Sequence, residues 1–217
     1  MGFVISFLFV FFIIGLSTIF EKKKILSIEG SRKFVHIGVC NWWFIAMYYF
    51  ISPIVAIIPF CFVIINYISY KKNIFSAMER GEGVKDLGTV YYSISLCILA
   101  LWSFFINSPE VGLIGILIMG YGDGFAAIVG KKWGKRAFVL NNNKTILGSI
   151  SVFLISFIIS LLTINYYLSP SISDLFVFSL IIGVISMVVE AITPIGFDNI
   201  SLPLITSLLY YGITKFI

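Results

Sequence analysis

Long apolar runs recur along almost the whole chain, and they limit what it can fold into more than any motif does. Eight runs of 17 to 23 residues are rich in Phe, Ile, Leu and Val. They cover residues 2–20, 34–51, 54–70, 89–107, 111–129, 146–168, 172–192 and 200–217. About 20 apolar residues cross the hydrocarbon core of a bilayer as a helix, which satisfies its own backbone hydrogen bonds. The sequence therefore predicts an all-α, polytopic membrane bundle with seven transmembrane helices, or eight if the last run also spans.

Composition rules out an ordinary soluble domain. Of the 217 residues, 59% are hydrophobic and 12% are charged, whereas soluble domains carry about 25% charged residues. We expect one membrane domain over residues 1–217, with a peripheral first span at 2–20 and a core at about 31–204. The three cysteines lie in apolar runs at no metal or redox spacing, so we expect them to pack.

The basic residues predict how the helices are oriented. Fourteen of the fifteen Lys and Arg fall within residues 22–33, 71–85 and 131–144, and only Lys215 lies elsewhere. Loops rich in Lys and Arg stay in the cytoplasm, so these stretches are predicted to be cytoplasmic and the N-terminus external. The first run is followed, not preceded, by basic residues, which is the reverse of a secretory signal peptide. The charge needs no nucleic-acid partner, and the predicted location is a membrane, the plasma membrane in a prokaryote.

One segment, residues 119–149, combines an acid inside an apolar run with cations after it: MGYGDGFAAIVGKKWGKRAFVLNNNKTILGS. Asp123 has a glycine on each side, and a carboxylate at membrane depth is costly enough to indicate function. Two lysines follow eight residues later, and a polar turn is predicted at 141–143, before Lys144. Proteins commonly bind Mg²⁺ through one or two carboxylates and the substrate's phosphates. A basic cytoplasmic loop beside helix-packing glycines explains the same residues equally well.

Two patches near the predicted cytoplasmic face precede this segment. In SRKFVH, Arg32 and His36 are one helical turn apart and share a face. Arginine can bind a phosphate with two nitrogens, whereas a lone histidine is more often a hydrogen-bonded core residue. The second patch, ERGEGVKDLGTVYY at 79–92, is glycine-rich and is either a mobile functional loop or an ordinary one.

A third patch follows it, at residues 190–203. Here Pro and Gly interrupt the helical pattern between Glu190 and Asp198. Such a break at membrane depth is tolerated only where protein or water surrounds the backbone. We therefore expect these two acids to face the protein interior or a polar site.

These patches carry motifs that resemble two related families of membrane enzymes. GDGFAAIVGKKWGK followed by NKTILGS is similar to a segment shared by the CTP-dependent polyprenol kinases (dolichol, phytol and diacylglycerol kinases) and the phosphatidate cytidylyltransferases. SRKFVHIG, GVKDLGTVYYSIS and EAITPIGFDNISLPL resemble the kinases alone. The cytidylyltransferases end in a signature that contains a histidine (Lys-Asp…His-Gly-Gly…Asp-Arg-x-Asp), and this chain has no histidine after His36. The resemblance spans residues 31–204 and favours the kinases.

The resemblance implies transfer of the γ-phosphate of CTP to the hydroxyl of an isoprenoid alcohol or diacylglycerol at the cytoplasmic face. The implied Mg²⁺ ligands are Asp123, Asp198 and Glu190. The implied catalytic residues are Asp123, His36 and Asp198, with the general base either His36 or an acid. The implied nucleotide and phosphate ligands are Arg32, Lys33, Gly122, Gly124, Gly130, Lys131, Lys132, Lys144, Thr145, Gly148 and Asn199. Some relatives pair two acids near position 198, where this chain has Phe197 before a single acid.

Two other functions remain open at this stage. A cytidylyltransferase would make a CDP-lipid and release pyrophosphate. A transporter also uses intramembrane acids and broken helices, but it is expected to have internal repeats, and this sequence has no convincing one. The implied partners are CTP, a membrane lipid alcohol and the bilayer; the sequence fixes neither the alcohol nor the oligomeric state.

Overall fold

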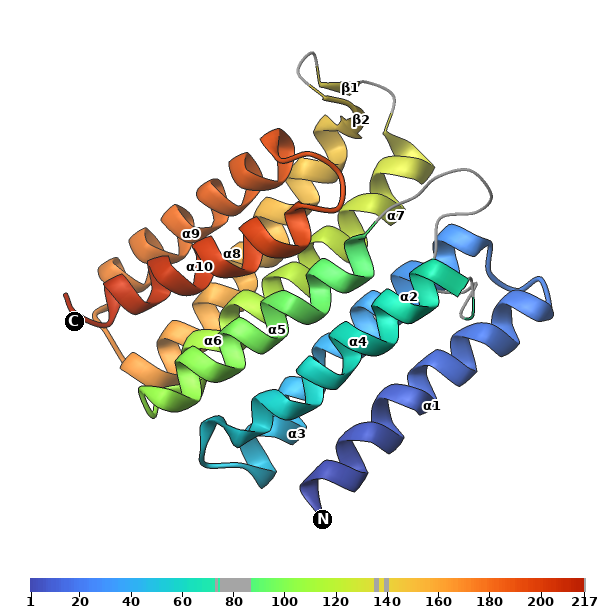
Figure 1. Cartoon of the computed structure of the whole chain (residues 1–217). Helices are drawn as coiled ribbons and strands as arrows, with labels where there is room; N and C mark the ends of the chain where they lie inside the picture. Colours follow the sequence, from blue (N-terminus) through green and yellow to red (C-terminus); the bar gives the residue numbers. More distant parts are fainter. Residues whose placement is uncertain (73, 75–86, 135–136, 139–140, 217) are drawn as a thin grey trace. The chain divides into compact units, whose positions relative to one another are not determined.

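The computed structural model describes residues 1–72, 74, 87–134, 137–138 and 141–216 (Figure 1). The chain forms two compact units, Met1–Pro109 and Glu110–Ile217, which are described in turn. Whether they act as the single membrane domain expected from the sequence stays a prediction.

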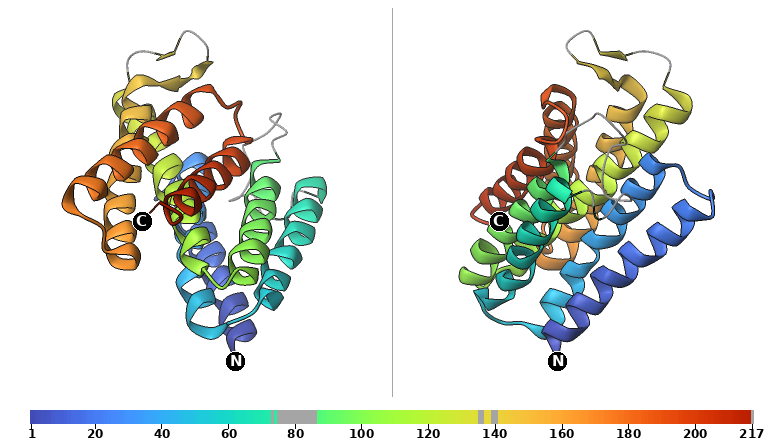
Figure 2. Two further views of the ribbon diagram at one scale, coloured as in Figure 1. Left: turned by 90° about the vertical axis from the view of Figure 1, so that its left-hand side faces the viewer. Right: turned by 45° about the vertical axis from the view of Figure 1, so that its right-hand side comes forward.

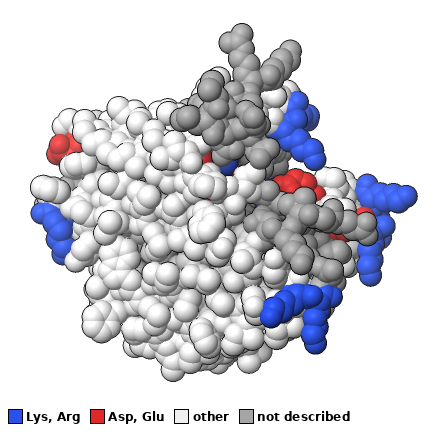
Figure 3. Space-filling view, turned by 45° about the horizontal axis from the view of Figure 1, so that its top comes forward, with Lys and Arg blue, Asp and Glu red and all other residues white. Residues whose placement is uncertain are grey.

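Within the described residues, six helices are long and apolar enough to cross a membrane. They are Gly2–Lys22, Pro53–Lys72, Gly88–Phe105, Pro109–Trp133, Ile146–Leu168 and Ile172–Ile192. Much of the surface seen in Figure 3 carries neither basic nor acidic side chains, which suits helices that contact lipid. The predicted helical membrane bundle is confirmed, and the chain is an integral membrane protein.

The other two predicted spans are present as shorter helices. The run at 34–51 is divided between α2 (Ile28–Cys40) and α3 (Trp42–Tyr49). At the break, the Asn41 side chain donates hydrogen bonds to the carbonyls of Ile37 (3.0 Å) and Gly38 (3.3 Å). Asparagine side chains commonly compete in this way with backbone amides for the carbonyls of a helix. The last run forms α10 (Asp198–Ile213), which has 16 residues.

The N-terminal unit consists of helices held by close packing and a few polar contacts. Its elements are α1 (Gly2–Lys22), α2, α3, the 3₁₀ turn η1 (Pro53–Ala56), α4 (Ile57–Lys72) and α5 (Gly88–Phe105). The Ser17 hydroxyl donates to the carbonyl of Ser31 (2.8 Å) and joins α1 to α2. Asn66 donates to the Ser93 hydroxyl (2.8 Å) and joins α4 to α5. Trp42 and Trp43 are fully buried in its core.

In the described part of the C-terminal unit there are one long helix, a short hairpin and three further helices. Its elements are α6 (Pro109–Leu117), the π-helical segment η3 (Ile118–Asp123), α7 (Gly124–Trp133), β1 (Ala137–Phe138), β2 (Asn141–Thr145), α8 (Ile146–Leu168), α9 (Ile172–Ile192) and α10. Helices α8 and α9 lie side by side in Figures 1 and 2. A Cβ on Gly115 would collide with the Pro203 carbonyl and the Ser207 hydroxyl, so glycine permits the close approach of α6 and α10.

The structure differs from the sequence analysis at two places in this unit. Residues 141–143, predicted as a turn, belong to β2, which pairs with β1 in antiparallel register (Ala137 opposite Thr145). Pairing of the two strands satisfies backbone groups that a turn would leave to other partners. The run at 111–129 is part of a longer continuous helix, Pro109–Trp133, and the π-helical segment lies in its middle.

Candidate functional site

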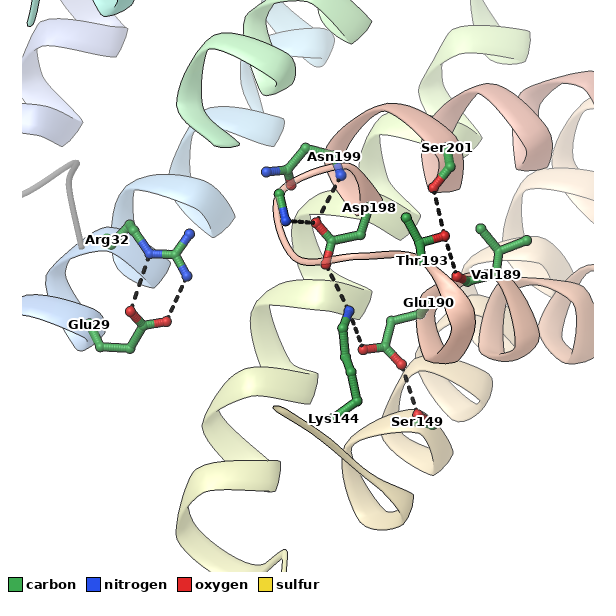
Figure 4. A network of polar contacts seen from close by, with 11 residues as sticks. Glu29, Arg32, Lys144, Ser149, Val189, Glu190, Thr193, Asp198, Asn199 and Ser201 are labelled. Carbon is green, nitrogen blue, oxygen red and sulfur yellow. Dashed lines mark hydrogen bonds and ion pairs between the residues drawn. The ribbon is translucent and has the colours of Figure 1, made fainter. Parts of the chain in front are cut away.

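Three buried carboxylates and one buried ammonium gather in the C-terminal unit. Lys144 lies between Glu190 and Asp198 (Figure 4), with its Nζ 2.8 Å from Glu190 Oε1 and 2.7 Å from Asp198 Oδ2. Asp123 is also buried, and its charge acts on Lys144. The structure thus brings together four of the predicted site residues, from segments far apart in the sequence.

The paired residues lie at or near the ends of helices. Lys144 lies in β2, two residues before α8 begins at Ile146, Glu190 lies in the last turn of α9, and Asp198 is the first residue of α10. Thr145 caps α8, because its hydroxyl accepts a hydrogen bond from the Gly148 amide (3.1 Å); an N-cap of this kind satisfies an amide that has no partner within the helix.

Asp198 is held by the backbone as well as by Lys144. Its Oδ1 accepts hydrogen bonds from the amides of Gly196 and Asn199, both at 3.1 Å. Gly196 has φ = 90°, a conformation that favours glycine. An acid in the first turn of a helix is also stabilised by the positive end of the helix dipole. The carboxylate is therefore fixed by local structure at the start of α10.

The carboxylates keep Lys144 charged. Burial by itself would lower the pKa of Lys144, but the charges of Asp198, Glu190 and Asp123 and a hydrogen bond to Asp198 raise its pKa above the ordinary value. When all four groups are ionised, three carboxylates against one ammonium leave a formal net charge of −2. Such a cluster attracts a further cation.

Asp123 ends the π-helical segment η3, immediately before α7. π-Helical turns are rare and occur frequently at functional sites. A Cβ on Gly122 would meet nothing closer than 3.6 Å, so this glycine is not demanded by packing. Gly124, the first residue of α7, is buried.

Two other predicted phosphate-binding glycines have a packing role. A Cβ on Gly130 would lie 2.6 Å from Thr145 Oγ1, and one on Gly148 would lie 3.0 Å from the Ala126 carbonyl oxygen. These glycines let α7 approach the start of α8 closely. Whether their backbone also contacts a nucleotide stays a prediction.

The remaining predicted residues of this unit lie near the same elements. Lys131 and Lys132 are exposed in the last turn of α7, and Lys132 Nζ lies 4.6 Å above the ring of Trp133. Asn199 is buried beside Asp198. The further basic residues at 135–136 fall outside the described part of the chain.

The predicted residues of the N-terminal unit all lie on α2. Arg32 is paired with Glu29 through two contacts, Nη2 to Oε1 at 2.6 Å and Nε to Oε2 at 3.3 Å; Figure 4 draws this pair too. Lys33 is buried. The His36 ring makes an edge contact with the Tyr92 ring (4.7 Å between centroids), and the Tyr92 hydroxyl donates to the His36 carbonyl (3.0 Å).

Three residues that contact the predicted site residues were not themselves predicted from the sequence. Glu29 could have been found from its spacing of three residues before Arg32 on a helix. Tyr92 belongs to a recognised motif, but nothing in the motif indicates that it contacts His36. Ser149, which donates to Glu190 Oε2 (2.8 Å), ends the motif NKTILGS, but nothing in the motif indicates this contact. The patch at 79–92 lies outside the described residues up to position 86.

The carboxylates of this cluster suit a magnesium ion whose other ligands are substrate phosphates and water. Among the side chains that the structure describes, no group of three or more His, Cys, Asp or Glu could hold a metal ion by itself. Lys144 occupies the space between Glu190 and Asp198. Magnesium in phosphate-handling sites needs only one or two carboxylates, because phosphates and water complete its shell. A fully ionised cluster would carry a net charge of −2 and would fit such an ion, whose binding here stays a prediction.

These features define a polytopic membrane protein with a buried acid–lysine cluster where α8 begins and α9 ends. The phytol kinase of Synechocystis sp. is 29% identical over 194 residues, 88% of this chain and 82% of the relative. A probable chloroplastic phytol kinase of Triticum aestivum is 30% identical over 210 residues, 88% of this chain and 69% of the relative. The CTP-dependent diacylglycerol kinase 1 of Saccharomyces cerevisiae is 26% identical over 163 residues, 67% of this chain and 55% of the relative.

The chain therefore belongs to the family of membrane lipid kinases that includes the phytol kinases and CTP-dependent diacylglycerol kinase, as its motifs predict. No family model matches it, and no solved structure matches it. The predicted relation to the phosphatidate cytidylyltransferases stays a prediction.

Proposed function

We propose that the protein transfers the γ-phosphate of CTP to the hydroxyl of a membrane lipid alcohol. The observation that carries this proposal is the buried cluster of Asp123, Lys144, Glu190 and Asp198, built from the segments whose motifs resemble the kinase family. Membership of that family supports the reaction class.

The cluster has the chemistry that phosphoryl transfer requires. This reaction needs positioning and charge neutralisation more than covalent chemistry from the protein. Lys144 offers an ammonium to the phosphates, and the exposed lysines at 131 and 132 add positive charge near the end of α7. Asp123 and Asp198 are the residues that would hold Mg²⁺ together with the nucleotide phosphates. When bound, the ion would neutralise the charge that develops on the transferred group.

The N-terminal unit contributes predicted roles that rest on its motif. Arg32 and Lys33 would bind phosphate oxygens, and Arg32 is well suited because its guanidinium binds two oxygens at once. The proton of the lipid hydroxyl would pass to His36 or to one of the acids, Asp123 or Asp198. The ring of His36 makes an edge contact with the ring of Tyr92, which would help to orient the imidazole.

We propose that the site faces the cytoplasm of the plasma membrane in a prokaryotic cell. Fourteen of the fifteen basic residues lie in three stretches that the positive-inside rule assigns to that side. One of these stretches ends at Lys144, so the cluster would lie at the cytoplasmic interface. The acceptor would enter sideways from the bilayer, with its chain between helices and its hydroxyl at the interface.

An isoprenoid alcohol such as phytol is the first candidate acceptor, and diacylglycerol is the second. The similarity to the Synechocystis phytol kinase covers 82% of that protein, whereas the similarity to the yeast diacylglycerol kinase covers 55% of its relative.

The proposal is tested by supplying purified protein with CTP labelled in the γ-phosphate and a panel of lipid alcohols, with and without Mg²⁺. The expected result is label in a lipid phosphate, CDP as product, and the highest rate with an isoprenoid alcohol. ATP should support a lower rate. Release of pyrophosphate with CMP in the lipid would instead indicate a cytidylyltransferase.

A further inference from the structure

Ser149 links the first turn of α8 to the last turn of α9 through a buried carboxylate. Its hydroxyl donates to Glu190 Oε2 at 2.8 Å, and Glu190 Oε1 lies 2.8 Å from Lys144 Nζ. The three side chains form one continuous chain of polar contacts (Figure 4), and all three are at least nine-tenths buried. Glu190 is thus held from one side by α8 and holds Lys144 on the other.

This arrangement differs from that of a carboxylate with an oxygen available to bind a metal ion. Both oxygens of Glu190 already accept contacts, one from a hydroxyl and one from an ammonium. A divalent ion bound directly to Glu190 would lie next to the ammonium of Lys144, and like charges at such a distance repel. The Oδ2 atom of Asp198 also lies 2.7 Å from Lys144 Nζ, but the backbone amides of Gly196 and Asn199 hold its Oδ1, so the position of Asp198 does not depend on Lys144 alone.

The local sequence around Lys144 explains why it needs such support. Lys144 is the residue before the N-cap Thr145, outside the regular hydrogen bonding of α8. A lysine side chain has four flexible carbons, and fixing it costs rotamer entropy. Glu190 sits on a different helix and fixes the ammonium at one place, while Ser149 fixes Glu190. The chain of contacts therefore sets where the ammonium points.

We propose that Glu190 and Ser149 are positioning residues that hold Lys144 ready for a nucleotide phosphate, and that Glu190 is not a ligand of the metal. This inference rests on the proposed function, since it assigns Lys144 the task of binding phosphate. It gives Glu190 a role other than the metal ligation that the sequence predicts, and it gives Ser149 a role that no motif indicates.

The test compares Ser149→Ala and Glu190→Gln with two matched controls in the full chain, purified in detergent. Ser151→Ala removes a hydroxyl from the same helix that donates to the Leu147 carbonyl of its own helix (2.9 Å). Ser186→Ala removes a buried hydroxyl of α9 that donates to the Ile182 carbonyl (2.7 Å). Three quantities are measured for each: CTP affinity in EDTA by calorimetry, the Mg²⁺ concentration for half-maximal activity, and the melting temperature.

Ser149→Ala should weaken metal-free CTP binding about tenfold, as expected for the loss of a hydrogen bond to a charged group. Glu190→Gln should weaken it at least as much. Ser149→Ala should leave the half-saturating Mg²⁺ concentration nearly unchanged. It should lower the melting temperature by only a few degrees, because a buried carboxylate loses one hydrogen bond. The two control variants should match the wild type in all three quantities.

A double variant examines whether the effect passes through Lys144. Once Lys144→Met has removed the ammonium, adding Ser149→Ala should cause no further loss of CTP affinity, whereas independent residues would give additive losses. If Lys144→Met does not fold, the comparison of Ser149→Ala with Ser151→Ala still decides the matter.

Three outcomes would overturn the inference. Metal-free CTP binding could be unchanged in both Ser149→Ala and Glu190→Gln. Glu190→Gln could raise only the Mg²⁺ requirement, which would make it a metal ligand. Ser149→Ala could lower the melting temperature without affecting CTP binding, which would make its role purely structural. A wild-type protein that neither binds CTP nor phosphorylates a lipid would instead refute the proposed function itself.

Discussion

Replacing Lys144 by methionine should destabilise the protein strongly, because it leaves two buried carboxylates facing each other. The Lys144 Nζ lies 2.8 Å from Glu190 Oε1 and 2.7 Å from Asp198 Oδ2, so these oxygens are at most about 5.5 Å apart. Two negative charges at this distance repel by about 3 kcal/mol at an effective dielectric constant of 20. Removing one partner from a buried ion pair typically costs about 3–5 kcal/mol, which agrees with this figure.

The assay is thermal unfolding of the purified protein at pH 7, followed by intrinsic fluorescence. Lys144→Met should lower the melting temperature by roughly 10 °C. Lys71→Met is the matched control, because Lys71 is exposed and its Nζ only lies above the Tyr67 ring at 4.8 Å. Neutralising one acid in the double variant Lys144→Met/Glu190→Gln should recover part of the loss. A melting temperature of Lys144→Met within about 2 °C of the wild type would refute the ion-pair argument, because such a shift corresponds to about 1 kcal/mol or less.

The difference in stability between wild type and Lys144→Met should depend on pH in a direction that can be worked out. The pKa of Lys144 is raised in the folded protein above its ordinary value of 10.5. A lysine whose pKa is raised by folding stabilises the folded protein by its full amount at any pH below the pKa of the unfolded chain. This stabilisation is lost only as the pH rises through the higher pKa of the folded protein. The difference between wild type and Lys144→Met should therefore persist from about pH 7 to about pH 9.5. A difference that disappears by pH 9 would contradict the assignment of a charged, paired lysine.

Three further predictions concern other parts of the chain. Asp123→Asn should reduce activity by a factor on the order of 10² or more with little change in melting temperature; a stable variant with near-normal activity would remove Asp123 from the site. Gly115→Ala should destabilise the protein by about 1–3 kcal/mol in denaturant unfolding, because a Cβ collides with the Pro203 carbonyl; an unchanged midpoint would contradict this. Cysteines placed at 142 and 169 should be labelled from opposite sides of the membrane, and external labelling at 142 would contradict the cytoplasmic site.

Much of the fold follows from the sequence because the bilayer permits few structures. Long apolar runs must form helices, and the sequence accordingly predicts the membrane bundle that the structure has. The apolar run predicted to begin at 146 is the helix α8, and the structure adds that the Thr145 hydroxyl caps its start. The side-chain amide of Asn41, which divides the second run, lies within an apolar pattern that gives no sign of a break. Hydropathy counts apolar residues and does not report such local competition for backbone carbonyls.

The sequence by itself determined the family and predicted which charged residues belong to the site, whereas only the tertiary structure decided how these residues are paired. Asp123, Lys144, Glu190 and Asp198 all follow from motifs and from the cost of charge near lipid. Lys144 and Asp198 are 54 positions apart, and Ser149 and Glu190 are 41 apart. Their contacts depend on where α8 begins, where α9 ends and how the two helices pack. That packing depends on the whole set of helices at once, so no local pattern could have shown that the lysine lies between the two acids.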